Sequence, residues 1–323
     1  MAGEKFGVFV PQGWKMDLVE LDDPVEQYEA MTRAGKVADE GGWDSIWVYD
    51  HFHTVPTPEI ETTFECWTAT ATLARDTTRV KVGQMVGCNG YRNPALYAKI
   101  ASTVDVASHG RLLAGIGAGW YEHEWKAYGY QWDDTPVRMG KFREAVEIIH
   151  KMWTEERPSF QGKYFSIDQP INEPKGAGKG HPPLWIGGGG EQVTLKLVAK
   201  YADGCNVGGG NVDLCRQKLE VLKRHCDALG RDFDSITRST SIQPLILLEP
   251  GQTPEAATTP IRGNVSHEEF AQSATIGTPD QIAEHIRALF AVGINYIITY
   301  MPRIAYDPTP IRRFAAEVIP QFA

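Results

Sequence analysis

The chain has 323 residues, of which 42% are hydrophobic and 23% charged, an ordinary composition for a soluble globular protein. Its 32 basic and 41 acidic residues give a net charge of −9, which argues against a nucleic-acid groove and against an anionic membrane surface. No apolar run approaches the ~20 residues that span a bilayer, and the polar N-terminus does not resemble a signal peptide. We therefore expect a cytoplasmic protein with no nucleic-acid or membrane partner.

Cysteine and histidine spacing gives no indication of a metal site. The five cysteines lack CxxC spacing and the nine histidines form no HExxH pattern. Free or buried thiols in a reducing compartment are the simplest interpretation, and we expect no metal.

Eight short apolar runs, rich in β-branched and aromatic residues, predict strands. In chain order they are residues 6–10, 45–49, 80–86, 112–116, 184–186, 204–207, 236–248 and 294–300.

Segments with apolar residues at spacings of three and four follow seven of these strands and predict helices. They are residues 24–40, 64–75, 94–108, 137–153, 192–201, 212–229 and 279–292. Three begin with recognisable capping sequences, Asp23-Pro24, Asn93-Pro94 and the capping box of residues 278–281. The stretches 154–183 and 249–266 are rich in glycine and proline and are expected to be loop insertions.

This alternation predicts a single α/β domain over residues 1–323, a (β/α)8 TIM barrel with loop insertions. A doubly wound open sheet is the alternative. Its dinucleotide fingerprint should follow the first strand, but the chain has Pro11-Gln12-Gly13 there, and the glycine-rich turns come after the fourth, fifth and sixth strands instead.

Asp50 and His51 directly follow the uncharged strand that ends at Tyr49. The carboxyl ends of parallel strands are where ligands bind and catalytic side chains project, and an imidazole can relay a proton near neutral pH. The pair could equally cap a loop and hydrogen-bond to each other. His51 is nevertheless our first catalytic candidate.

Glycine-rich turns supply the second group of candidates. Gly187–Gly190 separate a strand from a helix N-terminus, where backbone N–H groups can approach a phosphate. A tight turn would need only one glycine. After the fourth strand, residues 115–120 lead to Glu122 and Glu124, which are secondary acid/base candidates or solvated carboxylates at a helix start.

Five motifs in this order resemble the luciferase-like monooxygenase family, in its branch dependent on the deazaflavin coenzyme F420. They are residues 48–52 (VYDHF), 91–96 (YRNPAL), 115–121 (GIGAGWY), 185–191 (WIGGGGE) and 201–204 (YADG). The likeness extends over nearly the whole chain and is greatest to actinobacterial F420-dependent oxidoreductases.

The resemblance implies a barrel, usually a homodimer, with a deazaflavin ring in its mouth and a non-proline cis peptide near Met85-Val86. It assigns proton transfer to His51. Cofactor contacts are implied for Asp50, Met85, Val86, Cys88, Gly189, Gly190, Glu191 and Gln192. The chain has Trp120 where related sugar-phosphate dehydrogenases place an acid, so a sugar phosphate is not the expected substrate.

The resulting hypothesis is an F420-dependent oxidoreductase that transfers a hydride to or from a small carbonyl, alcohol, imine or activated alkene. One alternative is a monooxygenase that uses reduced FMN. The terminal phosphate of FMN would favour an Arg or Lys near the glycine turn, and the sequence has none there before Lys196. Another alternative is a flavin-binding barrel without catalytic activity.

Overall fold

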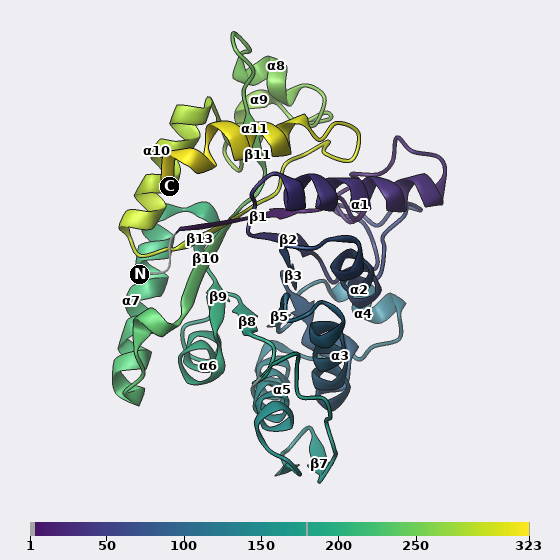
Figure 1. Ribbon diagram of the computed structural model, residues 1–323, viewed down its shortest axis with the longest axis vertical. Helices are drawn as coiled ribbons and strands as arrows, with labels where there is room; N and C mark the ends of the chain where they lie inside the picture. The colour runs from purple at the N-terminus through teal and green to yellow at the C-terminus, as the bar shows by residue number, and fades with distance from the viewer. Residues whose placement is uncertain (1–3, 179, 323) are drawn as a thin grey trace.

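Eight parallel strands close into a barrel in the computed structural model, which describes residues 4–178 and 180–322 (Figure 1). β13 pairs with β1, and β3 pairs with β5, so these eight strands form a closed ring. This closure confirms the predicted barrel and excludes the open sheet. The barrel strands are β1 (Lys5–Phe9), β2 (Ser45–Val48), β3 (Lys81–Gln84), β5 (Leu112–Gly117), β8 (Leu184–Gly187), β9 (Gly204–Asn206), β10 (Thr237–Ile242) and β13 (Tyr296–Thr299).

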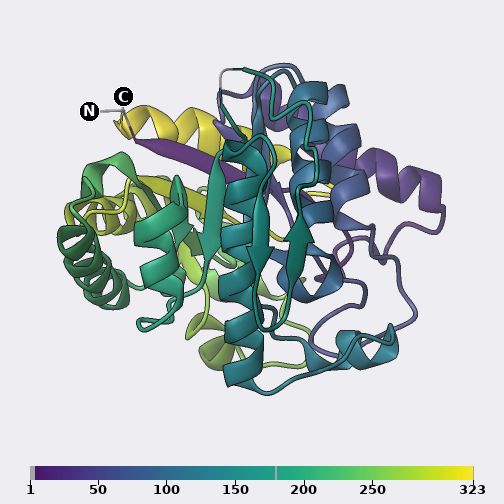
Figure 2. The ribbon, with the colours of Figure 1, turned by 90° about the horizontal axis from the view of Figure 1, so that it is seen from below.

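Helices surround these strands, and the view in Figure 2 shows α7 and α1 at opposite edges of the molecule. The predicted caps are present, since Asp23 accepts from the N–H of Val25 and Thr278 and Gln281 form the capping box. Within the described residues, no helix is long and apolar enough to cross a membrane. The surrounding helices are α1 (Pro24–Glu40), α2 (Cys66–Asp76), α3 (Pro94–Ala107), α5 (Thr135–Thr154), α6 (Thr194–Tyr201), α7 (Val212–Leu229), α10 (Pro279–Ala291) and α11 (Thr309–Glu317).

The seventh predicted strand, residues 236–248, is wrong as a single element. The barrel strand β10 ends at Ile242, and the chain resumes as β11 (Leu245–Leu247), which pairs with β12 (Thr275–Gly277) outside the barrel. Pro244 lies between them and has no N–H to donate to a sheet.

The inserted segments contain more structure than the sequence indicated. Residues 154–183 include an antiparallel hairpin of β6 (Ser159–Gln161) and β7 (Ser166–Asp168). The second insertion extends past residue 266 and includes α8 (Pro254–Thr258) and α9 (His267–Ala271). Two further short elements border the barrel mouth, namely β4 (Gly87–Cys88) and α4 (Glu122–Ala127).

Aromatic side chains fill the inside of the barrel. Every residue of β2 is buried, as predicted, with Ile46 and Val48 in the core between barrel and helices and Trp47 inside, 5.0 Å from Trp185 between ring centroids. A Cβ atom at Gly83 would come within 2.5 Å of the Trp47 ring, so glycine is required for this packing. The filled interior leaves the carboxyl-terminal mouth as the place for a ligand.

Candidate active site

The carboxyl ends of the barrel strands surround a cavity of about 530 Å³, a size typical of small-molecule sites. Side chains and glycines that follow different strands share its wall. They include Trp14, His51, Met85, Val86, Cys88, Trp120, Gly188, Asn206 and Ser241.

His51 lies in this wall and is held from two directions. Its ring stacks on Trp14, with centroids 4.1 Å apart and planes 4° from parallel. Its Nδ1 atom lies 2.8 Å from Oε2 of Glu124. Within the described part of the chain no hydrogen bond involves Nε2, so this nitrogen is left for a ligand in the cavity.

Glu124, in the first turn of α4, is a fully buried carboxylate with several donors. Oε2 accepts from His51 and from the hydroxyl of Tyr91, and Oε1 accepts from the N–H groups of Phe52 and His53, all at 2.8–2.9 Å. Burial alone would raise the pKa of Glu124, but the hydrogen bonds from His51, His53 and Tyr91 lower it below its ordinary value. The carboxylate is therefore ionised and can only accept, so Nδ1 of His51 carries a proton.

Asp50 is arranged differently from the expected Asp50–His51 pair. Its carboxylate is buried, accepts from the N–H of Cys88 at 2.7 Å, and forms a two-pronged ion pair with Arg92, which also contacts Glu65. Asp50 does not line the cavity. Its geometry supports a structural role at the end of β2, and the cofactor contact implied for Asp50 stays a prediction.

Glu122, one of the two secondary acid/base candidates predicted from the sequence, lies on the solvent side of α4. It is half exposed, forms a surface ion pair with Lys126 one helical turn later, and is not part of the cavity wall. The carboxylate that contacts His51 is Glu124, two residues further along the chain.

The expected non-proline cis peptide is present between Met85 and Val86. The Val86 side chain lies across the mouth between Gly117 and Gly187, where Cβ atoms would come within 2.5 and 2.6 Å of it. Met85, Val86 and Cys88 all line the cavity. Burial raises the pKa of Cys88 far above its ordinary value, so the thiol there is neutral.

The glycine turn after β8 is shaped partly by packing. Gly187 makes room for Val86, and Gly188 has a φ of 118°, which favours glycine. At Gly189 a Cβ would meet only the flexible side chain of Lys218, at 3.2 Å. Within the described residues, the N–H groups of residues 189–194 donate no hydrogen bond, so this turn leading into α6 is suited to an anion.

We expected no basic residue near this turn, but the side chain of Lys218 lies beside Gly189. It comes from α7, and its Nζ lies 2.7 Å from Oε1 of Glu191. Glu191 thus faces Lys218, and Gln192 is exposed. The absence of Arg or Lys in the local sequence therefore does not separate F420 from FMN.

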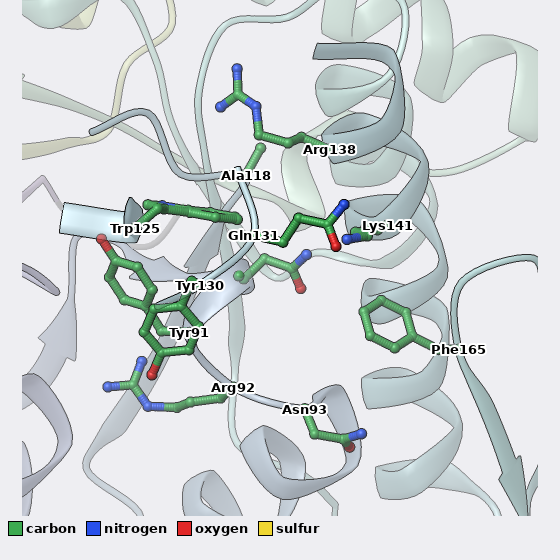
Figure 3. Close-up of a pocket in the computed structure, with 12 residues that line it drawn as sticks. Tyr91, Arg92, Asn93, Ala118, Trp125, Tyr130, Gln131, Arg138, Lys141 and Phe165 are labelled. Carbon is green, nitrogen blue, oxygen red and sulfur yellow. The ribbon is translucent and has the colours of Figure 1, made fainter. Parts of the chain in front are cut away.

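A smaller cavity of about 260 Å³ shares Ala118 with the wall of the larger one (Figure 3). Arg138 and Lys141 of α5 border it opposite Tyr91 and Trp125. Lys141 pairs with Asp133, and Arg138 donates from its Nη1 to the carbonyl of Gly119 at 2.6 Å, while its Nε has no partner among the described residues. Trp125 of α4 lines this cavity, so the residues around it help to hold the helix that carries Glu124.

Fold and site together define a (β/α)8-barrel protein with a cofactor-sized cavity, a histidine on one wall and an anion-compatible turn on another. The luciferase-like monooxygenase family matches residues 5–262, and the chain belongs to this family. The resemblance seen in the sequence motifs is confirmed.

Individual relatives include enzymes of two cofactor types. F420-dependent glucose-6-phosphate dehydrogenase of Nocardia farcinica is 30% identical over 299 residues, which cover 82% of this chain and 86% of that protein. The enzyme of the same name from Kineococcus radiotolerans is 30% identical over 234 residues, 68% of this chain but only 64% of that protein. FMNH(2)-dependent dimethylsulfone monooxygenase of Pseudomonas putida is 24% identical over 238 residues, 64% of this chain and 65% of that protein.

Comparison with solved structures supports the fold. An F420-dependent secondary alcohol dehydrogenase in complex with an F420-acetone adduct superposes with a TM-score of 0.77 at 19% identity, covering 99% of both chains. At this identity the similarity establishes the barrel architecture and leaves the chemistry to be argued from the residues.

Proposed function

We propose that the protein is a coenzyme F420-dependent oxidoreductase acting on a small carbonyl, alcohol, imine or activated alkene. The observation that carries the proposal is the buried pair His51–Glu124, which presents a free imidazole nitrogen to an open cavity. The F420-dependent dehydrogenases among its relatives support the choice of cofactor.

The residues around the cavity fit such a coenzyme. Trp14, Met85, Val86 and Trp120 offer apolar and aromatic surface to a flat ring. The unpaired N–H groups of residues 189–194 suit a phosphodiester, and we keep Gly189, Gly190, Glu191 and Gln192 as the proposed contacts there. When bound, the coenzyme would supply hydride transfer at C5 of its deazaflavin.

The chain's own contribution is to hold and move a proton at Nε2 of His51. Because the ionised Glu124 accepts from Nδ1, the neutral imidazole has its lone pair on Nε2 and can take a proton from a substrate hydroxyl. In the opposite direction, the protonated ring donates from the same atom. Stacking on Trp14 fixes the ring plane, so the proton is always offered at the cavity.

Reduced FMN remains the second candidate, since one relative uses it and Lys218 lies beside the turn where its phosphate would bind. Lys218 is already paired with Glu191, which lowers its net attraction for a dianion. A flavin-binding protein without activity is disfavoured by the open cavity next to His51.

Equilibrium fluorescence titration of the purified protein tests the cofactor. We expect coenzyme F420 to bind at least about tenfold more tightly than FMN, or about 1.4 kcal/mol. Equal affinity or tighter FMN binding would contradict the proposal. Gly189→Val should weaken F420 binding by blocking close approach to the turn, whereas Gly178→Val, in an exposed loop with open space around it, should not.

We further propose a cytoplasmic homodimer. The dimer is supported by the family resemblance, and Leu96, a large apolar side chain exposed on α3, is a candidate contact. Sedimentation velocity would detect the dimer, and Leu96→Glu should weaken it.

A further inference from the structure

A second cavity of about 470 Å³ opens at the same end of the barrel. It lies between the segment that follows β1, the segment that follows β13, and the insertion that contains α9. Its wall is largely apolar, formed by Val19, Val55, Ile261, Phe270, Tyr300 and Tyr306. Such a wall suits the hydrophobic part of a small organic molecule.

Lys15 brings a positive charge into this apolar wall. Its Nζ lies 4.7, 5.1 and 5.7 Å from the ring centroids of Tyr300, Trp14 and Tyr49. Within the described residues, this ammonium has no hydrogen-bond acceptor and no carboxylate at ion-pair distance. Aromatic faces compensate part of the cost of burying a cation, but its three N–H donors are left for a ligand.

The other charged groups around this cavity already have partners. Arg303 forms a two-pronged ion pair with Glu20 at 2.5 and 2.9 Å. Asp17 accepts from the N–H of Gly13 at 2.7 Å, and burial raises its pKa to about 6. Lys15 therefore differs from Arg303, and from Lys141 in the smaller cavity, which are both paired with carboxylates.

Trp14 and Tyr49 lie between this cavity and the mouth. Trp14 stacks on His51 and lies 4.3 Å from Tyr49 between centroids, and both rings line the mouth while they also contact Lys15. A ligand whose charged end lies at Lys15 would thus be separated from the histidine only by these two rings.

We infer that the second cavity holds the anionic end of the substrate, and that the substrate is a small organic acid with an apolar body whose carboxylate pairs with Lys15. That the ligand is a substrate rests on the proposed oxidoreductase function. The binding site itself rests on the cavity and its unpaired ammonium.

The pH dependence of acid binding has a defined direction. Burial lowers the pKa of Lys15 to about 8, and the charge of Asp17 partly opposes this shift. Burial raises the pKa of Tyr49, Tyr300 and Tyr306, so these neighbours stay neutral. With the Arg303–Glu20 pair charged throughout, affinity for a carboxylate should fall roughly tenfold between pH 7 and pH 9, as Lys15 loses its proton.

Isothermal titration calorimetry with 4-phenylbutyrate and its uncharged analogue 4-phenyl-1-butanol tests the inference, with and without coenzyme F420. We expect the acid to bind at least about tenfold more tightly than the alcohol. Lys15→Met should abolish this preference and Lys15→Arg should largely keep it. Lys36→Met, which removes an exposed lysine of α1, should leave it unchanged.

The outcomes separate this inference from the proposed function. A wild-type protein that binds both compounds equally, or a Lys15→Met variant that retains the preference while melting normally, would overturn the site. Selective acid binding without F420 binding would keep the site and reject the proposed oxidoreductase. F420 binding without selective acid binding would reject the site and leave the proposed oxidoreductase function in place.

Discussion

Two buried carboxylates lie at the end of β2, Asp50 within the chain that follows the strand and Glu124 against residues 51–53, and their partners differ. Asp50 is matched by Arg92 and the N–H of Cys88, so its charge is balanced inside the protein. Glu124 is matched partly by His51, which lines the cavity and whose second nitrogen has no hydrogen-bond partner among the described residues. The comparison shows that burial of an acid does not identify a catalytic site. What matters is whether its partner can exchange a proton with a ligand.

Among the variants of these residues, His51→Asn should reduce the reaction rate most. Asparagine retains hydrogen-bonding capacity but cannot carry a proton between substrate and solvent, so we expect single-turnover hydride transfer to slow by ~10²–10⁴-fold. Coenzyme affinity should change little. A rate like that of the wild type would remove His51 from the mechanism, and a large loss of coenzyme affinity would make it a binding residue.

Asp50→Asn should instead affect stability. Removing one partner of a buried ion pair leaves Arg92 undercompensated, at a typical cost of about 3–5 kcal/mol. We expect a value near the low end, because Glu65 still contacts Arg92. Urea unfolding would measure it. A variant of unchanged stability and greatly reduced turnover would mean that Asp50 acts on the cofactor or substrate after all.

Glu124→Gln should have an intermediate effect, because it alters the orientation and tautomer of His51 without removing the imidazole. Loss of such a supporting partner typically lowers activity 10–100-fold. The neighbouring Glu122→Gln is the matched control, since Glu122 pairs only with Lys126 at the surface, and its activity should equal that of the wild type. Equal losses in the two variants would contradict the distinction between them.

Lowering the pH should reduce the difference in unfolding free energy between the wild type and Glu124→Gln. Because the pKa of Glu124 is lowered in the folded state, its stabilising contribution is present above the ordinary value of 4.5 and is lost as the pH falls through the lowered value. Chemical unfolding at several pH values would measure this convergence. A stability difference that grows as the pH falls would contradict it.

Sequence patterns predicted most of the barrel but only part of the site. Strand composition and helix caps are local, so all eight barrel strands and caps such as Asp23 could be recognised. The partner of His51 is 73 residues away, and only the fold brings the two together. The sequence named both Glu122 and Glu124, and the i, i+4 spacing of Glu122 and Lys126 is the local signal that separates the surface carboxylate from the buried one. No local pattern connected Lys218 to the glycine turn.

The tautomer of His51 tests the central claim most directly and requires no substrate. Nitrogen NMR of selectively labelled protein, at a pH where the imidazole is neutral, distinguishes a proton on Nδ1 from one on Nε2. We predict that Nδ1 carries the proton in the wild type and that this preference is lost in Glu124→Gln, while Glu122→Gln keeps it. A wild-type His51 protonated on Nε2 would contradict the account, because no free lone pair would then face the cavity.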